Sequence, residues 1–260
     1  MPSLLPEIAS EAGQAALGLA FGEGCALCRE LGVLPGLPAL CRSCAGALPR
    51  LADPRCRVCG EGYAGVIPGP FRCTNCSDRP FAFEFAVAPF HARRGLRELV
   101  HFFKYQRQLW LGGTLGALLA TALSGPHADP RLAGETDWLL VPVPLHPRRL
   151  REREFNQARE LADVAGRLTG CAVVEALERT RYTTGQAHLT RQDRLHNLRG
   201  AFRMRPARPW RAAGRSLVEG RAVLLIDDIF TTGATMDECA RVLTHHGRAR
   251  RVAALTVARG

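Results

Sequence analysis

The sequence predicts an α/β fold, a mainly parallel sheet with helices on both faces, preceded by a small double zinc-ribbon module. Short apolar runs alternate with helix-like stretches after residue 80, and four C-x-x-C pairs come before it. The 260 residues are 47% hydrophobic and 23% charged, which is ordinary for globular proteins and excludes wholesale disorder. Because no run of eighteen apolar residues occurs, we expect no membrane span.

The start of the chain, residues 1–24, is expected to form a helical segment. Residues 8–21 are apolar enough for a helix that packs on other elements. The segment lacks a basic n-region and carries Glu7 and Glu11 before any cleavage-like site, so it does not resemble a secretory signal. We therefore expect a cytoplasmic protein.

Residues 25–80 are predicted to bind two structural zinc ions. Two thiolates three residues apart can hold one tetrahedral ion, and two such pairs complete a site. The spacing favours sequential pairing, with the first two pairs sharing one zinc and the last two sharing another, and it leaves a crossed pairing open. A secreted disulfide scaffold would need an oxidising compartment, and a redox motif would need a single pair. The four pairs are Cys25/Cys28, Cys41/Cys44, Cys56/Cys59 and Cys73/Cys76.

The two remaining cysteines, Cys171 and Cys239, have no such partner and are expected to be buried core thiols.

The turn-forming residues 77–80 end the cysteine-rich module. After them, apolar runs predict strands at 81–90, 138–143, 171–174, 222–226 and 252–257. Helical spacing predicts helices at 96–105, 109–123, 155–168 and 236–246.

Positive charge is concentrated in one part of the chain. Residues 145–215 hold sixteen arginines against seven acids, which accounts for most of the formal net charge of +11. The planar arginine fork suits phosphate oxygens, so this stretch favours an anionic ligand, either a phosphorylated metabolite or nucleic acid. A solvated basic surface is the alternative.

The most specific motif lies at residues 223–235, Val-Leu-Leu-Ile-Asp-Asp-Ile-Phe-Thr-Thr-Gly-Ala-Thr. An apolar strand leads into two acids, then into a turn of small and hydroxylated residues and a helix. The free N–H groups of a helix N-terminus bind phosphate, Gly233 lets the backbone approach it, and threonine hydroxyls add donors. Two acids would repel a phosphate beside them, but they are explained if they accept hydrogen bonds from sugar hydroxyls further along the ligand. A ribose 5-phosphate-like ligand fits this layout. Strand-end acids followed by an ordinary helix cap are the alternative.

At these residues the sequence resembles the type I phosphoribosyltransferases, whose ligand is phosphoribosyl pyrophosphate (PRPP), taken with Mg²⁺. The resemblance implies that Asp227 and Asp228 hold the ribose hydroxyls. It also implies that the 5-phosphate lies in the loop formed by Thr231, Thr232, Gly233, Ala234 and Thr235.

Further segments resemble the ComF family of competence proteins. The likeness runs from about Cys25 to Arg259 and implies a phosphoribosyltransferase-like domain over residues 81–260. It rests on the zinc knuckles, on Phe-Lys-Tyr at 103–105, Val-Pro-Val-Pro at 141–144 and Arg-Glu-Phe-Asn-Gln at 153–157, and on segments 179–186, 194–197 and 200–202. The family usually has glycine where this chain has Glu154. An acid there would repel pyrophosphate if it pointed inward, and would favour a helix N-terminus if it pointed to solvent.

The same resemblance supplies the other candidate residues. A pyrophosphate loop follows Pro144 and holds Arg148, Arg149 and Arg151, with an exposed basic loop as the alternative. Residues 179–199 lack a hydrophobic period and suggest a lid. The alternative for Asn156 and Gln157 is that they cap a helix without binding a ligand. The alternative for Lys104, the only lysine, is that it is a surface residue of a helix. The pyrophosphate and lid candidates are Lys104, Arg153, Asn156, Gln157, Arg181, Thr183, Gln186, Arg194 and Asn197.

Three functions fit these observations. The ComF resemblance implies an accessory of natural transformation that handles incoming single-stranded DNA together with competence machinery. A second interpretation is a true phosphoribosyltransferase that acts on a nitrogenous acceptor. The third is a non-catalytic protein that senses PRPP. Turnover with an acceptor separates the second from the third, and salt-dependent DNA binding separates the first from a metabolic enzyme.

Overall fold

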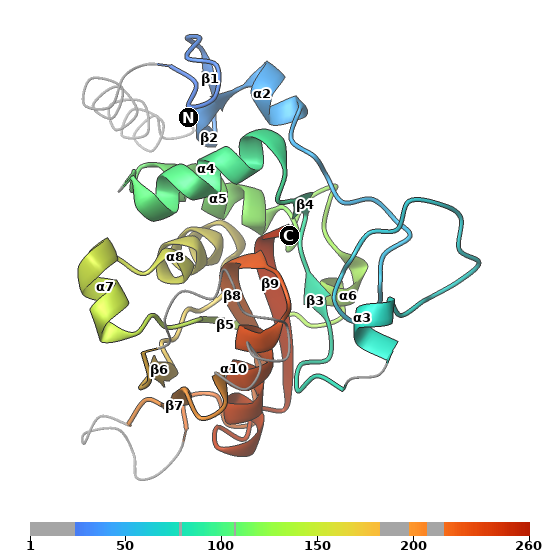
Figure 1. Cartoon of the computed structure of the whole chain (residues 1–260), viewed down its shortest axis with the longest axis vertical. Helices are drawn as coiled ribbons and strands as arrows, with labels where there is room; N and C mark the ends of the chain where they lie inside the picture. The colour runs from blue at the N-terminus through green and yellow to red at the C-terminus, as the bar shows by residue number, and fades with distance from the viewer. Residues whose placement is uncertain (1–23, 78–79, 107, 183–197, 207–215) are drawn as a thin grey trace, which may run out of the picture.

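A five-stranded parallel sheet forms the centre of the molecule (Figure 1). The computed structural model describes residues 24–77, 80–106, 108–182, 198–206 and 216–260. Four strands are hydrogen-bonded in the order β3 (Ala86–Val87), β9 (Arg251–Arg259), β8 (Ala222–Phe230) and β5 (Trp138–Pro142). A fifth, β4 (Phe90–His91), also pairs with β9. All pairings in this sheet are parallel.

The sheet is covered on both faces, because its strands are apolar on both sides. On β8, Leu224 and Ile226 face one core, while Val223 and Leu225 face the other. The first core is closed by α4 (Arg94–Tyr105), α5 (Leu111–Ala120) and α8 (Gln157–Thr169). The second is closed by α10 (Ala234–His245) and by a small antiparallel pair of strands, β6 (Leu177–Arg179) and β7 (Phe202–Met204). The predicted α/β fold with a mainly parallel sheet is confirmed.

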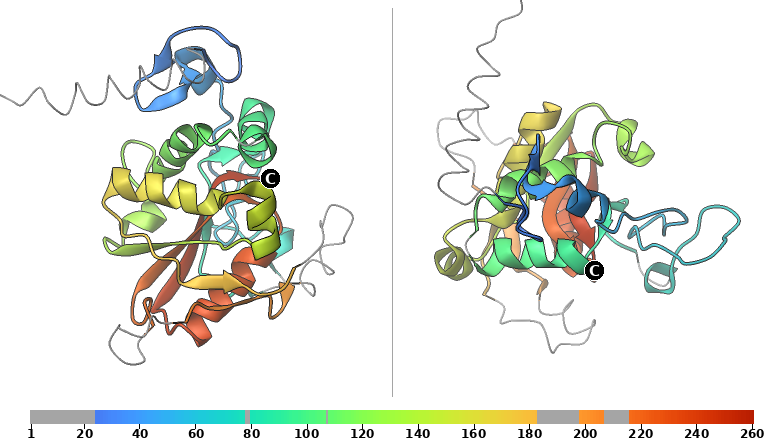
Figure 2. Two further views of the ribbon diagram at one scale, coloured as in Figure 1. Left: turned by 90° about the vertical axis from the view of Figure 1, so that its left-hand side faces the viewer. Right: turned by 90° about the horizontal axis from the view of Figure 1, so that it is seen from above.

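The cysteine-rich segment has two parts, which pack against different cores of the α/β body. The first part contains β1 (Val33–Leu34), β2 (Leu37–Cys41) and α2 (Arg42–Gly46), and it lies over α4 and α5 (Figure 2). The second part ends in α3 (Thr74–Ser77) and lies beside β3. Two short helices, α6 (Pro130–Ala133) and α7 (Pro147–Arg153), flank β5 in the sequence. In the part of the chain that is described, no helix has the length and hydropathy needed to cross a bilayer.

Several element boundaries differ from those expected. The predicted strand 81–90 is replaced by two short strands, β3 and β4. The strand pairing is interrupted at Ala88–Pro89, because proline offers no N–H to the sheet. Residues 171–174 make only an isolated bridge, between Val173 and Leu140. Cys239 is buried as expected, whereas Cys171 is half-buried. The basic loop after Pro144 contains helix α7. The predicted helix within residues 8–21 lies outside the described residues.

Candidate functional site

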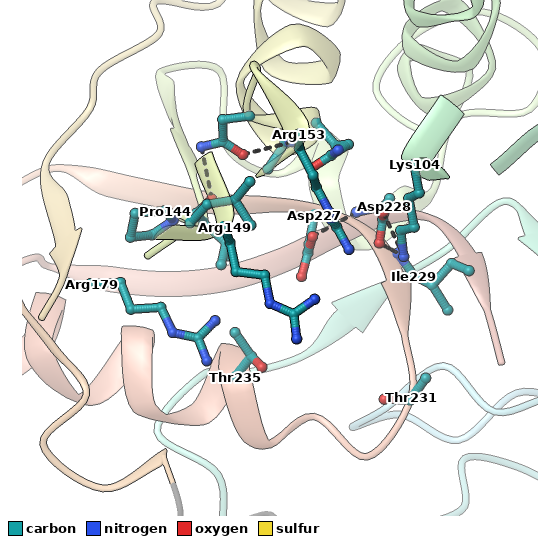
Figure 3. Close-up of a pocket in the computed structure, with 15 residues that line it drawn as sticks. Lys104, Pro144, Arg149, Arg153, Arg179, Asp227, Asp228, Ile229, Thr231 and Thr235 are labelled. Atoms are coloured by element: carbon teal, nitrogen blue, oxygen red, sulfur yellow. Dashed lines mark hydrogen bonds and ion pairs between the residues drawn. The ribbon is translucent and has the colours of Figure 1, made fainter. Parts of the chain in front are cut away.

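A cavity of about 340 Å³ opens at the carboxyl ends of β5 and β8. Ligands of open parallel α/β sheets bind at this edge. Figure 3 shows charged side chains from β8, α4, α7 and β6 turned toward this space. The residues that line the cavity are Lys104, Val143, Pro144, Leu145, Arg149, Arg153, Asn156, Gln157, Ala158, Arg179, Asp227, Asp228, Ile229, Thr231 and Thr235.

The two acids at the end of β8 have unequal surroundings. Asp228 is 5% exposed, and both of its carboxylate oxygens have partners within the protein. Its Oδ1 accepts the Ile229 N–H at 2.6 Å, and its Oδ2 lies 2.7 Å from Nζ of Lys104. Asp227 is half-buried, and its Oδ1 accepts the Asp228 N–H at 2.9 Å. Among the described residues no partner occupies its Oδ2, so Asp227 has the oxygen that is available to a ligand.

Burial and charge shift the pKa values of this group. Burial, followed by the neighbouring Asp228 charge, raises the pKa of Asp227 to about 7, while the charges of Lys104 and Arg153 oppose that rise. Burial opposes the charged form of Lys104, but the Asp228 carboxylate outweighs it and raises the lysine pKa. Asp227 therefore exchanges its proton near neutral pH, while Lys104 stays a cation.

Three arginines also line the cavity that contains Asp227 and Asp228. Figure 3 shows the guanidinium groups of Arg149, Arg153 and Arg179 directed into the space between Asp227 and Thr235. Burial lowers the pKa of Arg179, although arginine stays charged at neutral pH. The sequence analysis listed Arg153 as a candidate and placed Arg149 in the expected pyrophosphate loop together with Arg148 and Arg151, but it did not single out Arg179. Arg149 cannot be told from Arg148 and Arg151 by sequence, because the turn of α7 decides which of them faces the cavity.

The start of α8 forms another part of the wall. Asn156 caps this helix, since its Oδ1 accepts the Ala158 N–H at 3.1 Å and its Nδ2 donates to the Val143 carbonyl at 3.1 Å. Gln157 is 2% exposed, and its Oε1 accepts a hydrogen bond from Arg153 at 3.1 Å. Its Nε2 is buried and has no partner among the described residues. Asn156 is thus occupied by its capping role, whereas the amide NH₂ group of Gln157 keeps its donors for a ligand.

The hydroxyl-rich loop joins β8 to α10 as the motif predicts. Gly233 is the N-cap of α10 with φ of +76°, and a Cβ there would lie 2.6 Å from the Phe230 ring, so only glycine fits. Thr231 and Thr235 line the large cavity, and Thr232 lines a smaller one.

Among the lid candidates, Arg181 donates to the Arg199 carbonyl and does not line the large cavity. The remaining candidates, Thr183, Gln186, Arg194 and Asn197, lie outside the described residues.

The eight paired cysteines form two groups that could hold metal ions. Cluster 1 is Cys25, Cys28, Cys41 and Cys44, and cluster 2 is Cys56, Cys59, Cys73 and Cys76. The grouping is sequential, and the sulfurs of each cluster lie within 4.8 Å of one another. Around a tetrahedral zinc ion with Zn–S bonds of about 2.3 Å, sulfurs lie about 3.8 Å apart. The Cys28–Cys41 and Cys59–Cys73 sulfur distances are 3.7 and 3.5 Å, so both donor sets fit zinc.

Each cluster contains one thiol that ionises easily. Burial opposes ionisation of Cys25, but backbone N–H groups of Cys28, Cys41 and Leu27 outweigh it and lower its pKa to about 6. A hydrogen bond from Cys59 lowers the pKa of Cys56 to about 4, with backbone N–H groups contributing. Burial raises the pKa of Cys44 and of Cys76 in the same clusters, so a zinc ion, which binds thiolates, would have to displace the protons of those thiols.

Comparison with known proteins places the chain in a family. The sequence matches no family model. It is 29% identical over 206 residues to Competence protein F of Haemophilus influenzae, covering 78% of this chain and 85% of that protein. It is 30% identical over 227 residues to DNA utilization protein YhgH of Escherichia coli K12, covering 86% and 92%. The chain belongs to the ComF family. Competence protein ComFC of Bacillus subtilis is 30% identical over 126 residues, covering 47% and 45%.

The departure from the ComF pattern at Glu154 has a structural explanation. Glu154 ends α7 in the left-handed conformation, with φ of +69°, which favours glycine. Its side chain is exposed and does not line the large cavity. Helix α8 begins after it, with Asn156 as its N-cap. Glu154 therefore does not point into the cavity, which was the condition for repelling a pyrophosphate there.

Proposed function

We propose that this ComF-family protein binds PRPP with Mg²⁺ and acts in the cytoplasm in the handling of incoming single-stranded DNA. One observation carries the ligand assignment. An acid with an available oxygen, a hydroxyl-rich loop at a helix N-terminus and three arginines all face one cavity of about 340 Å³. A sugar that carries phosphate groups at two ends matches such an arrangement of acceptors and cations.

The ligand is oriented by these groups. Loop 231–235 and the N-terminus of α10 receive the 5-phosphate, because free N–H groups and hydroxyls favour its charge. Asp227 accepts hydrogen bonds from ribose hydroxyls, and Asp228 stays paired with Lys104. Arg149, Arg153 and Arg179 bind the pyrophosphate, and the buried Nε2 of Gln157 donates to one of its oxygens.

Substitution of Asp227 tests this assignment. Asp227→Asn removes a charged acceptor while keeping the shape, so we expect PRPP affinity at pH 8 to fall about 10- to 100-fold. Calorimetric titration in the presence of Mg²⁺ measures this change. Asp163→Asn is the control, because that carboxylate pairs with Arg159 at 2.6 Å and does not line the cavity. Equal affinity of Asp227→Asn and the parent protein would contradict the assignment.

The pH dependence of the same titration follows from the pKa of Asp227, which is about 7. The ionised acid is the acceptor, so affinity is lost as pH falls through 7, by up to about tenfold per pH unit. The ligand phosphate also titrates in this range, but its contribution is common to the parent and Asp227→Asn. The ratio of their affinities therefore shrinks toward pH 6.

The proposed role with DNA rests on the names of the relatives and on the excess of arginine in residues 145–215. Binding to a thymidine oligonucleotide should weaken steeply between 50 and 200 mM salt. Replacing the exposed Arg148 and Arg151 with alanine should lower the logarithmic salt slope by roughly 1.4, about 0.7 for each contact. Alanine at Arg42 and Arg97, which are exposed outside the basic stretch, is the matched control. Fluorescence anisotropy that detects no oligonucleotide binding would refute this role.

A further inference from the structure

Cluster 2 lies against the beginning of the candidate phosphate loop. A small cavity of about 70 Å³ separates them, lined by Cys59 and Cys76 on one side and by Thr231 and Thr232 on the other. Its wall is completed by Asn75, Phe81, Phe230 and Arg259. The metal-binding thiols and the loop therefore share one packed region, although they are far apart in the sequence.

A buried arginine joins the two sides. Arg259 is 6% exposed, its Nη2 lies 2.5 Å from Oε2 of Glu61, and its Nη1 donates to the Phe230 carbonyl at 3.0 Å. Glu61 belongs to the knuckle of cluster 2, because its carbonyl accepts the Cys56 N–H at 2.8 Å. Phe230 is the last residue of β8 before Thr231. Arg259 thus connects the cluster 2 knuckle to the residue from which the loop begins.

The far end of the loop is connected to the segment that follows cluster 2. The Ala82 N–H donates to Oδ1 of Asp237 at 2.7 Å, and Asp237 lies in the first turn of α10. The Asp237 N–H in turn donates to the Gly233 carbonyl at 2.8 Å. Nearby, Phe83 packs edge-on against Phe230 at 5.9 Å. The start of the loop is therefore connected to the cluster 2 knuckle through Arg259, and the helix turn after the loop is bonded to the segment that follows cluster 2.

Cluster 1 has no such connection in the described structure. Its neighbours are helices, since the Ala39 N–H donates to Oγ1 of Thr114 on α5 at 2.9 Å. Leu27 packs so closely on α4 that a Cβ on Gly95 would lie 2.5 Å from its Cδ1. None of its four cysteines lines either cavity next to the loop.

We propose that cluster 2, with its metal bound, holds loop 231–235 in its binding conformation and that Arg259 is the positioning residue for this effect. The metal fixes the knuckle and hence the Glu61 carboxylate, which holds the Arg259 guanidinium against the Phe230 carbonyl. Loss of the metal releases the knuckle, so the start of the loop loses a buried charged hydrogen bond. The effect on loop order stands by itself, whereas the effect on PRPP affinity rests on the proposed function.

A matched pair of cysteine variants tests the proposal. Cys73→Ser in cluster 2 and Cys44→Ser in cluster 1 each alter one half-buried ligand, and metal analysis should find one zinc ion lost from each. We expect Cys73→Ser to speed hydrogen exchange of residues 230–236 by about tenfold and Cys44→Ser to leave it unchanged. PRPP affinity should fall with Cys73→Ser alone. Equal exchange of this segment in both variants would overturn the proposal.

A second set of variants keeps all eight cysteines. Glu61→Gln and Arg259→Lys should retain both zinc ions and still speed exchange of residues 230–236 by about threefold to tenfold. Glu84→Gln is the control, because it weakens a similar ion pair, at 2.5 Å to Arg251, that does not reach the loop. If Glu61→Gln and Glu84→Gln give the same exchange, the role of Arg259 is refuted. If the exchange results hold but the parent protein does not bind PRPP, the proposed function fails and the coupling stands.

Discussion

Clusters 1 and 2 use the same ligands with nearly the same spacing, but they differ in burial and in what they contact. Cluster 1 lies over α4 and α5, with Cys28 exposed and Cys44 half-buried. Three of the four cysteines of cluster 2 are buried, and its knuckle is bonded through Arg259 to the end of β8. A repeated metal motif thus acquires different contacts from the elements packed against it.

Both clusters nonetheless belong to the main cores, which leads to the largest expected effect. Cys25 and Cys41 pack in the same core as α4 and α5, and Cys56 and Cys76 pack in the other core with Phe83. Removing both metals should lower the free energy of unfolding of the whole chain by more than about 5 kcal/mol in one cooperative transition. Calorimetry with and without chelator measures this loss. Two separate transitions, with the second unchanged by chelator, would show that the cysteine-rich segment folds alone.

A smaller effect on stability is expected when a contact next to either cluster is removed, and the effect on ligand binding should differ between the two clusters. Thr114→Val and Asp237→Ala each remove a buried acceptor that bonds a segment next to one cluster to the α/β body. Each should cost about 1–3 kcal/mol of stability, measured by denaturant unfolding. Only Asp237→Ala should also weaken PRPP binding, because Asp237 lies in the first turn of α10. A similar loss of PRPP affinity in Thr114→Val would erase the functional difference between the regions.

The smallest effect concerns the rate of metal release. Since Cys28 is exposed, a chelator reaches cluster 1 more easily than cluster 2. We expect two phases of zinc release that differ by about tenfold in rate, with the first assigned to cluster 1. A metal-sensitive dye follows the release, and alkylation with mass spectrometry identifies the freed cysteines. Simultaneous release from both clusters would contradict the difference in burial.

Much of the fold was predictable because its central strands are continuous apolar runs. Predicted strands at 138–143, 222–226 and 252–257 correspond to β5, β8 and β9. Strand β8 continues through the acid pair to Phe230, because Asp227 still pairs with Thr256 in the middle of the sheet. The strand predicted from the sequence ended at Ile226, because the apolar run stops there and acids are uncommon inside strands. The strand predicted at 171–174 was wrong, as one bridge replaces it.

Within the candidate site, local motifs were easier to predict than long-range contacts. Lys104, Arg153 and Gln157 were named from their motifs, and they line the cavity with Asp227 and Asp228. The pairing of Lys104 with Asp228, rather than with Asp227, depends on how α4 packs beside β8. No sequence pattern predicts that packing. The sequence therefore could not show that Asp227 has an oxygen available to a ligand while both oxygens of Asp228 are paired.

The sequence by itself determined the four Cys-x-x-Cys pairs and the hydroxyl-rich loop, because each depends on residues a few positions apart. The grouping of the pairs into two sequential clusters was favoured by their spacing and decided by the fold. Cys-x-x-Cys spacing brings two thiols onto one turn, and Gly233 supplies the positive φ that begins α10. Only the tertiary structure decided which cluster touches the loop and which acid keeps a free oxygen. Those properties depend on contacts such as Arg259 with Glu61, which arise when the sheet buries distant segments together.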